Sequence, residues 1–151
     1  MMPIRKVFPS LFLLFALLPV HGVPADSTRE NSSHIPGTTL AKEPYSHERF
    51  DQLQSQGAVV VIDVHAAWCP TCAKQQAALE SYREINPDKK FFILEIDFDT
   101  QKDFVRHFRA PRQSTLLIYK GREQFWFSVG ETRPAVITAE LDKAITFKPR
   151  S

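Results

Sequence analysis

Runs of apolar residues along the chain predict the strands of a buried sheet. Residues 58–64 are almost all β-branched or small and apolar, which is typical of a strand buried on both faces. Residues 91–97 form a second run of this kind. Residues 115–119 and 124–129 flank a turn at 120–122, which is the pattern of an antiparallel hairpin. The pattern therefore predicts a mixed central sheet of about four strands.

Segments with helical features alternate with these strands. Ser46 is suited to cap a short helix that Gly57 ends, and residues 73–85 suit a longer helix. Residues 101–108 and 134–145 predict two further helices, the last with a proline in its first turn. The order helix, strand, helix, strand, helix, strand, strand, helix predicts an α/β fold with three layers, in which helices cover both faces of the sheet.

The first 25 residues have the pattern of an export signal. Arg5 and Lys6 give a positive start, an apolar run follows at 11–18, and the small residues of 23–25 suit signal peptidase. The apolar run is shorter than the roughly 20 residues that span a bilayer. We therefore expect residues 1–25 to be a cleaved signal peptide, with an uncleaved membrane anchor as the alternative. Export to the periplasm or beyond the cell would place the chain where disulfides persist.

A polar segment and one domain follow the predicted signal. Residues 26–44 are rich in Ser, Thr, Pro, Gly, Asn and Glu and lack apolar periodicity, which predicts a flexible linker. Residues 45–147 have the length of a single domain, and 148–151 form a short tail. The formal charge of the 151-residue chain is only +2, and removing the signal leaves 17 basic against 17 acidic residues. We therefore expect no nucleic-acid partner.

Cys69 and Cys72 are the two cysteines of the chain, and they lie where a predicted buried strand gives way to a helix. The free N–H groups and the positive dipole end of a helix stabilise an anion. We therefore expect Cys69 to be exposed and its pKa to be lowered. Pro70 fits the first turn, because its missing N–H is not needed there. Cys69 would attack a partner disulfide, and Cys72 would release the mixed disulfide.

Two simpler interpretations of the cysteine pair are weaker. A tetrahedral zinc site needs four ligands, and the chain has no second cysteine pair, so we expect no metal. A permanent disulfide between residues three apart closes too small a loop to restrain the unfolded chain much. The spacing therefore favours a redox function.

The motif around the cysteine pair is Trp68, Cys69, Pro70, Thr71 and Cys72. On this motif, the segment 45–147 resembles the thioredoxin fold. Asp63, six residues before Cys69, matches the buried aspartate that in this family assists proton removal from the second cysteine. The resemblance implies a thiol:disulfide oxidoreductase that needs no cofactor.

The Trp-Cys-Pro-Thr-Cys form of the motif is similar to that of exported thioredoxin-like proteins that serve cytochrome c maturation and related periplasmic reduction. This resemblance implies a monomer that reduces disulfide-containing protein substrates and is itself re-reduced by a membrane thiol reductant carrier. A thiol oxidase or isomerase is one alternative. A non-catalytic thiol chaperone or metal-handling module is another.

A serine stands where the thioredoxin family has a cis-proline opposite the active site. In the family the backbone of this loop pairs with the substrate. The resemblance therefore implies that Gln113, Ser114 and Thr115 bind substrate. Without the proline, the substrate groove would be reshaped and metal would reach the thiols more easily.

Two further positions depart from the family pattern. Glu95 stands where the family often has a lysine near the aspartate. It either faces Asp63, so that one carboxyl holds its proton more tightly, or points outward. His65 stands where an aromatic residue is common. It either lowers the pKa of Cys69 or packs at the end of a strand.

The aromatic residues outside the motif are expected to serve packing. Phe125 and Phe127 alternate along a predicted strand and are core candidates, while Trp126 faces the other way. Trp68 is expected to pack beside the active site and to shape partner access.

Overall fold

The computed structural model describes residues 42–148, so the predicted signal peptide, most of the predicted linker and residues 149–151 of the tail lie outside it. Helices and strands alternate along this part of the chain in the predicted order, apart from one additional short strand at its start. The elements are β1 (Glu43–Pro44), α1 (His47–Ser55), β2 (Val59–His65), α2 (Pro70–Ile85), β3 (Phe92–Asp97), α3 (Lys102–His107), β4 (Thr115–Lys120), β5 (Glu123–Val129) and α4 (Pro134–Thr146).

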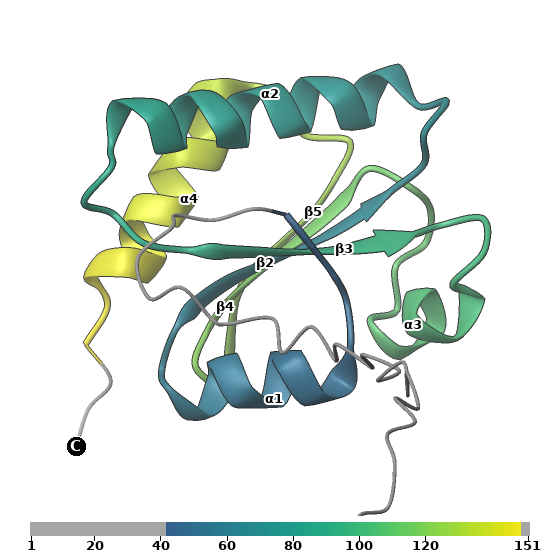
Figure 1. Cartoon of the computed structure of the whole chain (residues 1–151). Helices are drawn as coiled ribbons and strands as arrows, with labels where there is room; N and C mark the ends of the chain where they lie inside the picture. Colours follow the sequence, from purple (N-terminus) through teal and green to yellow (C-terminus); the bar gives the residue numbers. More distant parts are fainter. Residues whose placement is uncertain (1–41, 149–151) are drawn as a thin grey trace, which may run out of the picture. The chain divides into compact units, whose positions relative to one another are not determined.

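The strands form one mixed sheet in the order β1-β3-β2-β4-β5. β3 pairs in parallel with β1 and β2, whereas β4 pairs antiparallel with β2 and β5. Helices α1 and α3 lie on one face of the sheet, and α2 and α4 lie on the other (Figure 1). The predicted three-layer α/β/α fold with a mixed sheet is confirmed, with five strands rather than four.

The additional strand, β1, lies inside the segment that was predicted to be a linker. Glu43 is in register with Leu94, and the N–H of Tyr45 donates to the carbonyl of Glu95 over 2.9 Å. Two residues are too few to show any alternation of polar and apolar side chains, which is why the pattern did not reveal this strand. The folded domain therefore begins at least two residues earlier than predicted.

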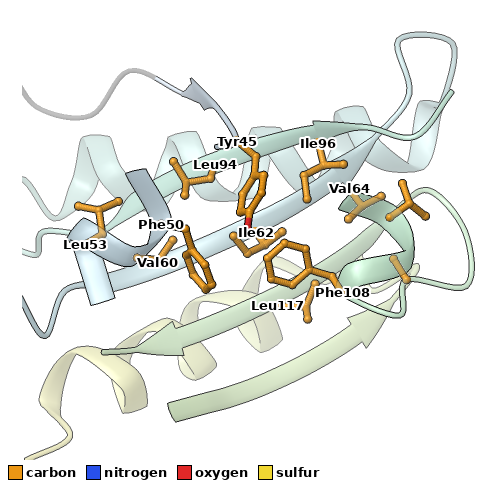
Figure 2. Packing of buried hydrophobic residues seen from close by; sticks show 12 residues of the cluster. Tyr45, Phe50, Leu53, Val60, Ile62, Val64, Leu94, Ile96, Phe108 and Leu117 are labelled. Carbon is orange, nitrogen blue, oxygen red and sulfur yellow. The ribbon is translucent and has the colours of Figure 1, made fainter. Parts of the chain in front are cut away.

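The two faces of the sheet each carry an apolar cluster. All of Val59–Val64 is buried, as expected for a strand covered on both faces. Figure 2 shows the cluster beneath α1 and α3, where rings from three separate segments meet the aliphatic side chains of β2 and β3. The labelled members of this cluster are Tyr45, Phe50, Leu53, Val60, Ile62, Val64, Leu94, Ile96, Phe108 and Leu117.

The helix boundaries follow from local chemistry. Ser46 caps α1 as predicted, because its hydroxyl accepts the N–H of Arg49 over 3.1 Å. Gly57 follows α1 with a φ of 65°, a conformation that suits glycine. Helix α2 begins at Pro70, so the motif forms its first turn. No helix within residues 42–148 has the length and apolar character needed to cross a membrane.

The prediction that Phe125 and Phe127 share a core-facing side of β5 is wrong. Phe127 is 42% exposed, whereas Phe125 and Trp126 both pack against the apolar cluster on the α2 and α4 face. The register between β4 and β5 shifts between Ile118 and Tyr119, which inserts an extra residue into β5. A bulge of this kind breaks the strict alternation of side chains along a strand.

Candidate active site

The sulfur of Cys69 caps the helix that contains both cysteines. Cys69 has extended backbone angles as the N-cap of α2, and its Sγ accepts the N–H of Cys72 over 3.2 Å. This bond satisfies one of the N–H groups that a helix leaves free at its first turn. Cys69 and Cys72 are free thiols, and Cys69 is only 6% exposed, so its predicted exposure is wrong. Ala66 and Phe98 pack against the two cysteines and help to cover them.

Ser114 lies directly against both sulfurs. Its Oγ is 3.1 Å from the Sγ of Cys69 and 3.2 Å from the Sγ of Cys72. Its N–H donates to the carbonyl of Val64 over 2.8 Å, and its carbonyl accepts the N–H of Gly130 over 2.7 Å. The loop that was expected opposite the active site is therefore in contact with it.

The environments of the two thiols drive their pKa values in opposite directions. Burial raises the pKa of Cys69, but hydrogen bonds from the Cys72 and Ser114 side chains and from the Cys72 and Thr71 backbone outweigh burial and lower it overall. Burial and the neighbouring Cys69 side chain raise the pKa of Cys72. One sulfur is therefore biased toward the thiolate and its partner toward the thiol.

Asp63 is a fully buried carboxyl group on β2, beneath α2. Its Oδ2 accepts a hydrogen bond of 3.1 Å from Nε2 of Gln76, while its Oδ1 has no partner among the described residues. The pKa of Asp63 is raised to about 6, because burial and the charge of Glu95 outweigh the hydrogen bond from Gln76 and the charges of His65 and Lys42. The carboxyl therefore changes its protonation close to neutral pH.

Glu95 faces Asp63, which resolves the two orientations that the sequence left open. The two residues are in register across the parallel pair β2 and β3, and Nε2 of Gln76 also donates to Oε1 of Glu95 over 3.2 Å. Nζ of Lys42 lies 3.8 Å from the same oxygen and 2.8 Å from a carboxylate oxygen of Glu80. One amide thus bridges two carboxyl groups, and a lysine stands on the outer side.

The remaining residues of the predicted environment lie around the rim of the site. His65 ends β2 half-buried and acts electrostatically on Asp63, so an effect of His65 on Cys69 stays a prediction. Trp68 is 63% exposed, and its indole N–H donates to Asp99 over 2.7 Å. An exposed ring held at one end is suited to contact a partner.

Pro70 and Thr71 occupy the first turn of α2, where Pro70 is exposed and Thr71 is half-buried. Pro70 stands at a position where a helix needs no backbone N–H, in line with the expectation from the sequence. The backbone of Thr71 contributes to the lowered pKa of Cys69, after burial and the side-chain hydrogen bonds. These two residues therefore shape the approach to the sulfur.

The three predicted substrate-binding residues differ in their exposure and in whether their polar groups are already hydrogen-bonded inside the domain. Ser114 and Thr115 are buried, and the hydroxyl of Thr115 donates to the carbonyl of Arg112 over 2.6 Å. The backbone N–H and C=O of Ser114 are both used inside the domain. Only Gln113 is partly exposed. A direct contact with substrate stays a prediction, and Gln113 is the residue placed to make it.

Two glutamines of the site were not predicted. Gln75 is fully buried, and its Nε2 donates to the carbonyls of Ser114 and Glu131 over 3.2 and 2.9 Å. Gln76 holds the two carboxyl groups. They follow Cys72 by three and four positions, which places all three on one face of a helix. Polar residues on the buried face of a predicted helix are the signal that could have identified them.

The arrangement supports thiol chemistry. The site combines a sulfur biased toward the thiolate, a second thiol one turn away and a buried carboxyl whose pKa is raised to about 6. Thiol–disulfide exchange needs groups of these kinds, as nucleophile, resolving thiol and proton acceptor. Within residues 42–148, no three side chains of His, Cys, Asp or Glu gather closely enough to hold a metal ion.

Comparison with known proteins agrees with the fold and the cysteine pair. The thioredoxin family model matches residues 41–143. Thioredoxin-1 of Saccharomyces cerevisiae is 31% identical over 88 residues, which cover 58% of this chain and 82% of that protein. The thioredoxin of Coprinus comatus is 22% identical over 98 residues, which cover 65% of this chain and 92% of that protein.

Solved structures agree as well. The crystal structure of Trxlp from Edwardsiella tarda EIB202 is 37% identical with a TM-score of 0.62, and the match covers 67% of this chain and 98% of that one. The thioredoxin of Trypanosoma brucei brucei has a TM-score of 0.61 at 20% identity, over 76% of this chain and 99% of that one, and supports the fold alone. The chain therefore belongs to the thioredoxin family, as a thiol:disulfide oxidoreductase whose CxxC pair is Cys69 and Cys72.

Proposed function

We propose that this chain is an exported reductase of disulfides in partner proteins. The observation that carries the disulfide chemistry is the opposite bias of the two thiols at the start of α2, where hydrogen bonds outweigh burial at Cys69 and burial dominates at Cys72. The reductive direction rests on the resemblance of the motif to that of exported reductases, and export rests on the N-terminal pattern. An enzyme that reduces disulfides needs one sulfur ready to attack and a second that stays protonated until the first has reacted.

In the first step, the thiolate of Cys69 attacks one sulfur of the partner disulfide. A bond forms between the two sulfurs, the partner disulfide breaks, and the leaving sulfur takes the electron pair as a thiolate. The capping position of Cys69 favours its anionic form before the attack, because the N–H of Cys72 and the positive end of α2 both stabilise negative charge.

In the second step, Cys72 loses its proton and attacks Cys69. The mixed disulfide breaks, the partner leaves as its second thiolate, and a disulfide forms between Cys69 and Cys72. Two electrons have then passed from the cysteine pair to the partner. Asp63 accepts the proton, because a carboxyl with a pKa of about 6 is mostly ionised at neutral pH. Gln76 holds it beneath α2, one turn beyond Cys72.

The proposed location rests on the N-terminal pattern. A positive start, an apolar run and small residues before position 26 are typical of an export signal. An exported reductase has to regain two electrons after each cycle, so we propose a membrane thiol reductant carrier as its partner. Fractionation of cells that produce the full chain tests this, with release of a shortened protein into the periplasm expected. Retention of a full-length, soluble protein in the cytoplasm would exclude export.

The reaction is tested by reduction of insulin with dithiothreitol as the electron donor. The wild-type chain is expected to accelerate insulin precipitation, and Cys69→Ala is expected to abolish the acceleration. Ser55→Ala, a substitution on an exposed residue at the end of α1, is the matched control. No acceleration by the folded wild-type chain would favour a binding module, such as a thiol chaperone, over an enzyme.

The partner and the direction of electron flow need separate measurements. Cys72→Ala removes the resolving thiol, so partner proteins are expected to stay bound to Cys69 through a disulfide that dithiothreitol releases. Equilibration with glutathione gives the reduction potential. A potential near that of the strong oxidant DsbA, about −120 mV, would make the chain an oxidase rather than a reductase.

A further inference from the structure

Ser114 holds an unusual backbone conformation. Its φ is 63°, in the left-handed region that non-glycine residues seldom adopt. Three hydrogen bonds inside the domain hold it there, to Val64, Gly130 and Gln75. Strained residues of this kind persist only where the surrounding structure fixes them, and they gather at functional sites. In this conformation the hydroxyl lies within hydrogen-bond distance of both sulfurs.

The chemistry of a hydroxyl limits what it can do at this place. A serine hydroxyl has one hydrogen to donate and two lone pairs that accept. It lies within 3.1 and 3.2 Å of the two sulfurs, so it can donate to only one of them at a time while accepting from the other. An ionised sulfur accepts hydrogen bonds, whereas a protonated one is a weak donor. The direction of the hydroxyl therefore depends on which sulfur is charged.

We propose that Ser114 is a positioning residue whose hydroxyl follows the negative charge from one sulfur to the other during the catalytic cycle. Before the attack it donates to the thiolate of Cys69, which also accepts the S–H of Cys72. Once Cys69 is in the mixed disulfide and carries no charge, the O–H turns and donates to Cys72 as that sulfur ionises. This inference rests on the proposed reaction. The turn breaks no covalent bond and transfers no electrons.

The proposal also concerns the redox balance of the enzyme. The hydroxyl stabilises an anion that exists in the dithiol form and is lost in the disulfide. Removing it should disfavour the dithiol, which makes the chain a stronger reductant. The shift expected for one hydrogen bond to a charged group is roughly tenfold in the equilibrium with glutathione, or about 30 mV toward more negative potential.

The test compares two substitutions that remove the hydroxyl in different ways. Ser114→Ala keeps Cβ, and Ser114→Gly also fits the positive φ without strain, so a folding defect in the first does not leave the question open. Ser81→Ala, on the exposed face of α2, makes the same chemical change away from the sulfurs. Circular dichroism establishes that each variant is folded.

The first readout is the rate of Cys69 alkylation across a pH series, with the modified cysteine identified by mass spectrometry. Both Ser114 variants are expected to react about tenfold more slowly than wild type below the midpoint of the profile, with the midpoint about one unit higher. The second readout is the equilibrium with glutathione. Asp63 and the groups that act on it, His65, Glu95 and Lys42, are the same in every protein compared.

Three results would overturn the proposal. Profiles that match wild type in both folded variants would show that the hydroxyl does not stabilise the thiolate. A change in Ser114→Gly alone would assign the effect to the backbone rather than to the hydroxyl. An equal change of the Cys69 alkylation profile in Ser81→Ala would show that the effect comes from altering α2 in general and not from the Ser114 hydroxyl. Failure of this proposal can be told apart from failure of the proposed function. A wild-type chain that does not reduce insulin still has a Cys69 whose alkylation rate can be measured across the pH series.

Discussion

Replacing Asp63 with asparagine should stabilise the protein and remove part of its pH dependence. The carboxyl is fully buried on β2, and Asn has nearly the same shape, so Nε2 of Gln76 keeps an oxygen to donate to. What the substitution removes is the cost of holding a negative charge in an apolar layer. In the proposed reaction the same charge is the proton acceptor, so the gain in stability should come with slower release of the mixed disulfide.

The magnitude follows from the shift of the pKa. The Asp63 pKa is about 6 in the folded protein, against an ordinary value of 3.8. Below about pH 4 both states hold the proton, and between about pH 4 and 6 only the folded state does, so the free energy of unfolding falls as the pH rises. Above about pH 6 the free energy of unfolding has fallen by the full amount that this carboxyl contributes. This fall amounts to about two pKa units, or roughly 3 kcal/mol.

The assay is urea unfolding of wild type and Asp63→Asn, in the reduced state, from about pH 4 to pH 8. The two proteins are expected to have nearly equal stability at the acid end and to differ by roughly 3 kcal/mol at the alkaline end, with Asp63→Asn more stable. Asp88→Asn changes an exposed carboxylate and is the matched control. Curves for wild type and Asp63→Asn that run parallel across the whole range would refute a raised pKa for Asp63.

Three further substitutions test neighbouring parts of the account. Glu95→Lys replaces a carboxylate that raises the pKa of Asp63 with a cation, so the Asp63 titration seen by NMR should move to lower pH, and an unchanged midpoint would contradict the network. Ser114→Pro removes the N–H that donates to Val64 and cannot adopt a positive φ, so it should cost about 2–4 kcal/mol in urea unfolding, and an unchanged urea midpoint would exclude this loop geometry. Ile62→Ala should cost about 2–5 kcal/mol in the same assay, because Ile62 is fully buried in the central strand, and a loss below about 1 kcal/mol would contradict that packing.

The central part of the fold could be predicted because its signals are local. A strand buried on both faces appears in the sequence as a nearly continuous apolar run, which in β2 only Asp63 interrupts, and β2 was predicted to within one residue at each end. The spacing of Cys69 and Cys72 alone indicates the start of α2 and its thiol chemistry. These features depend on neighbours along the chain, which a sequence displays directly.

Features that depend on distant segments were missed. β1 pairs with β3 through two residues, and the bulge in β5 is set by how β4 pairs with it, so neither leaves a period in the sequence. The predicted exposure of Cys69 failed for a similar reason, because Ser114 covers the sulfur from 45 positions away. The amide of Gln76 links two carboxyl groups that lie on different strands.

The account depends most directly on the ionisation of Cys69. The decisive measurement is the alkylation rate of the wild-type dithiol protein from acid to alkaline pH, with each cysteine quantified separately. Cys69 is expected to react with a midpoint below about 8.5, the pKa of a free cysteine, and Cys72 with a midpoint above it. A Cys69 midpoint at or above that value, or a Cys72 that ionises first, would contradict the assignment of nucleophile and resolving thiol.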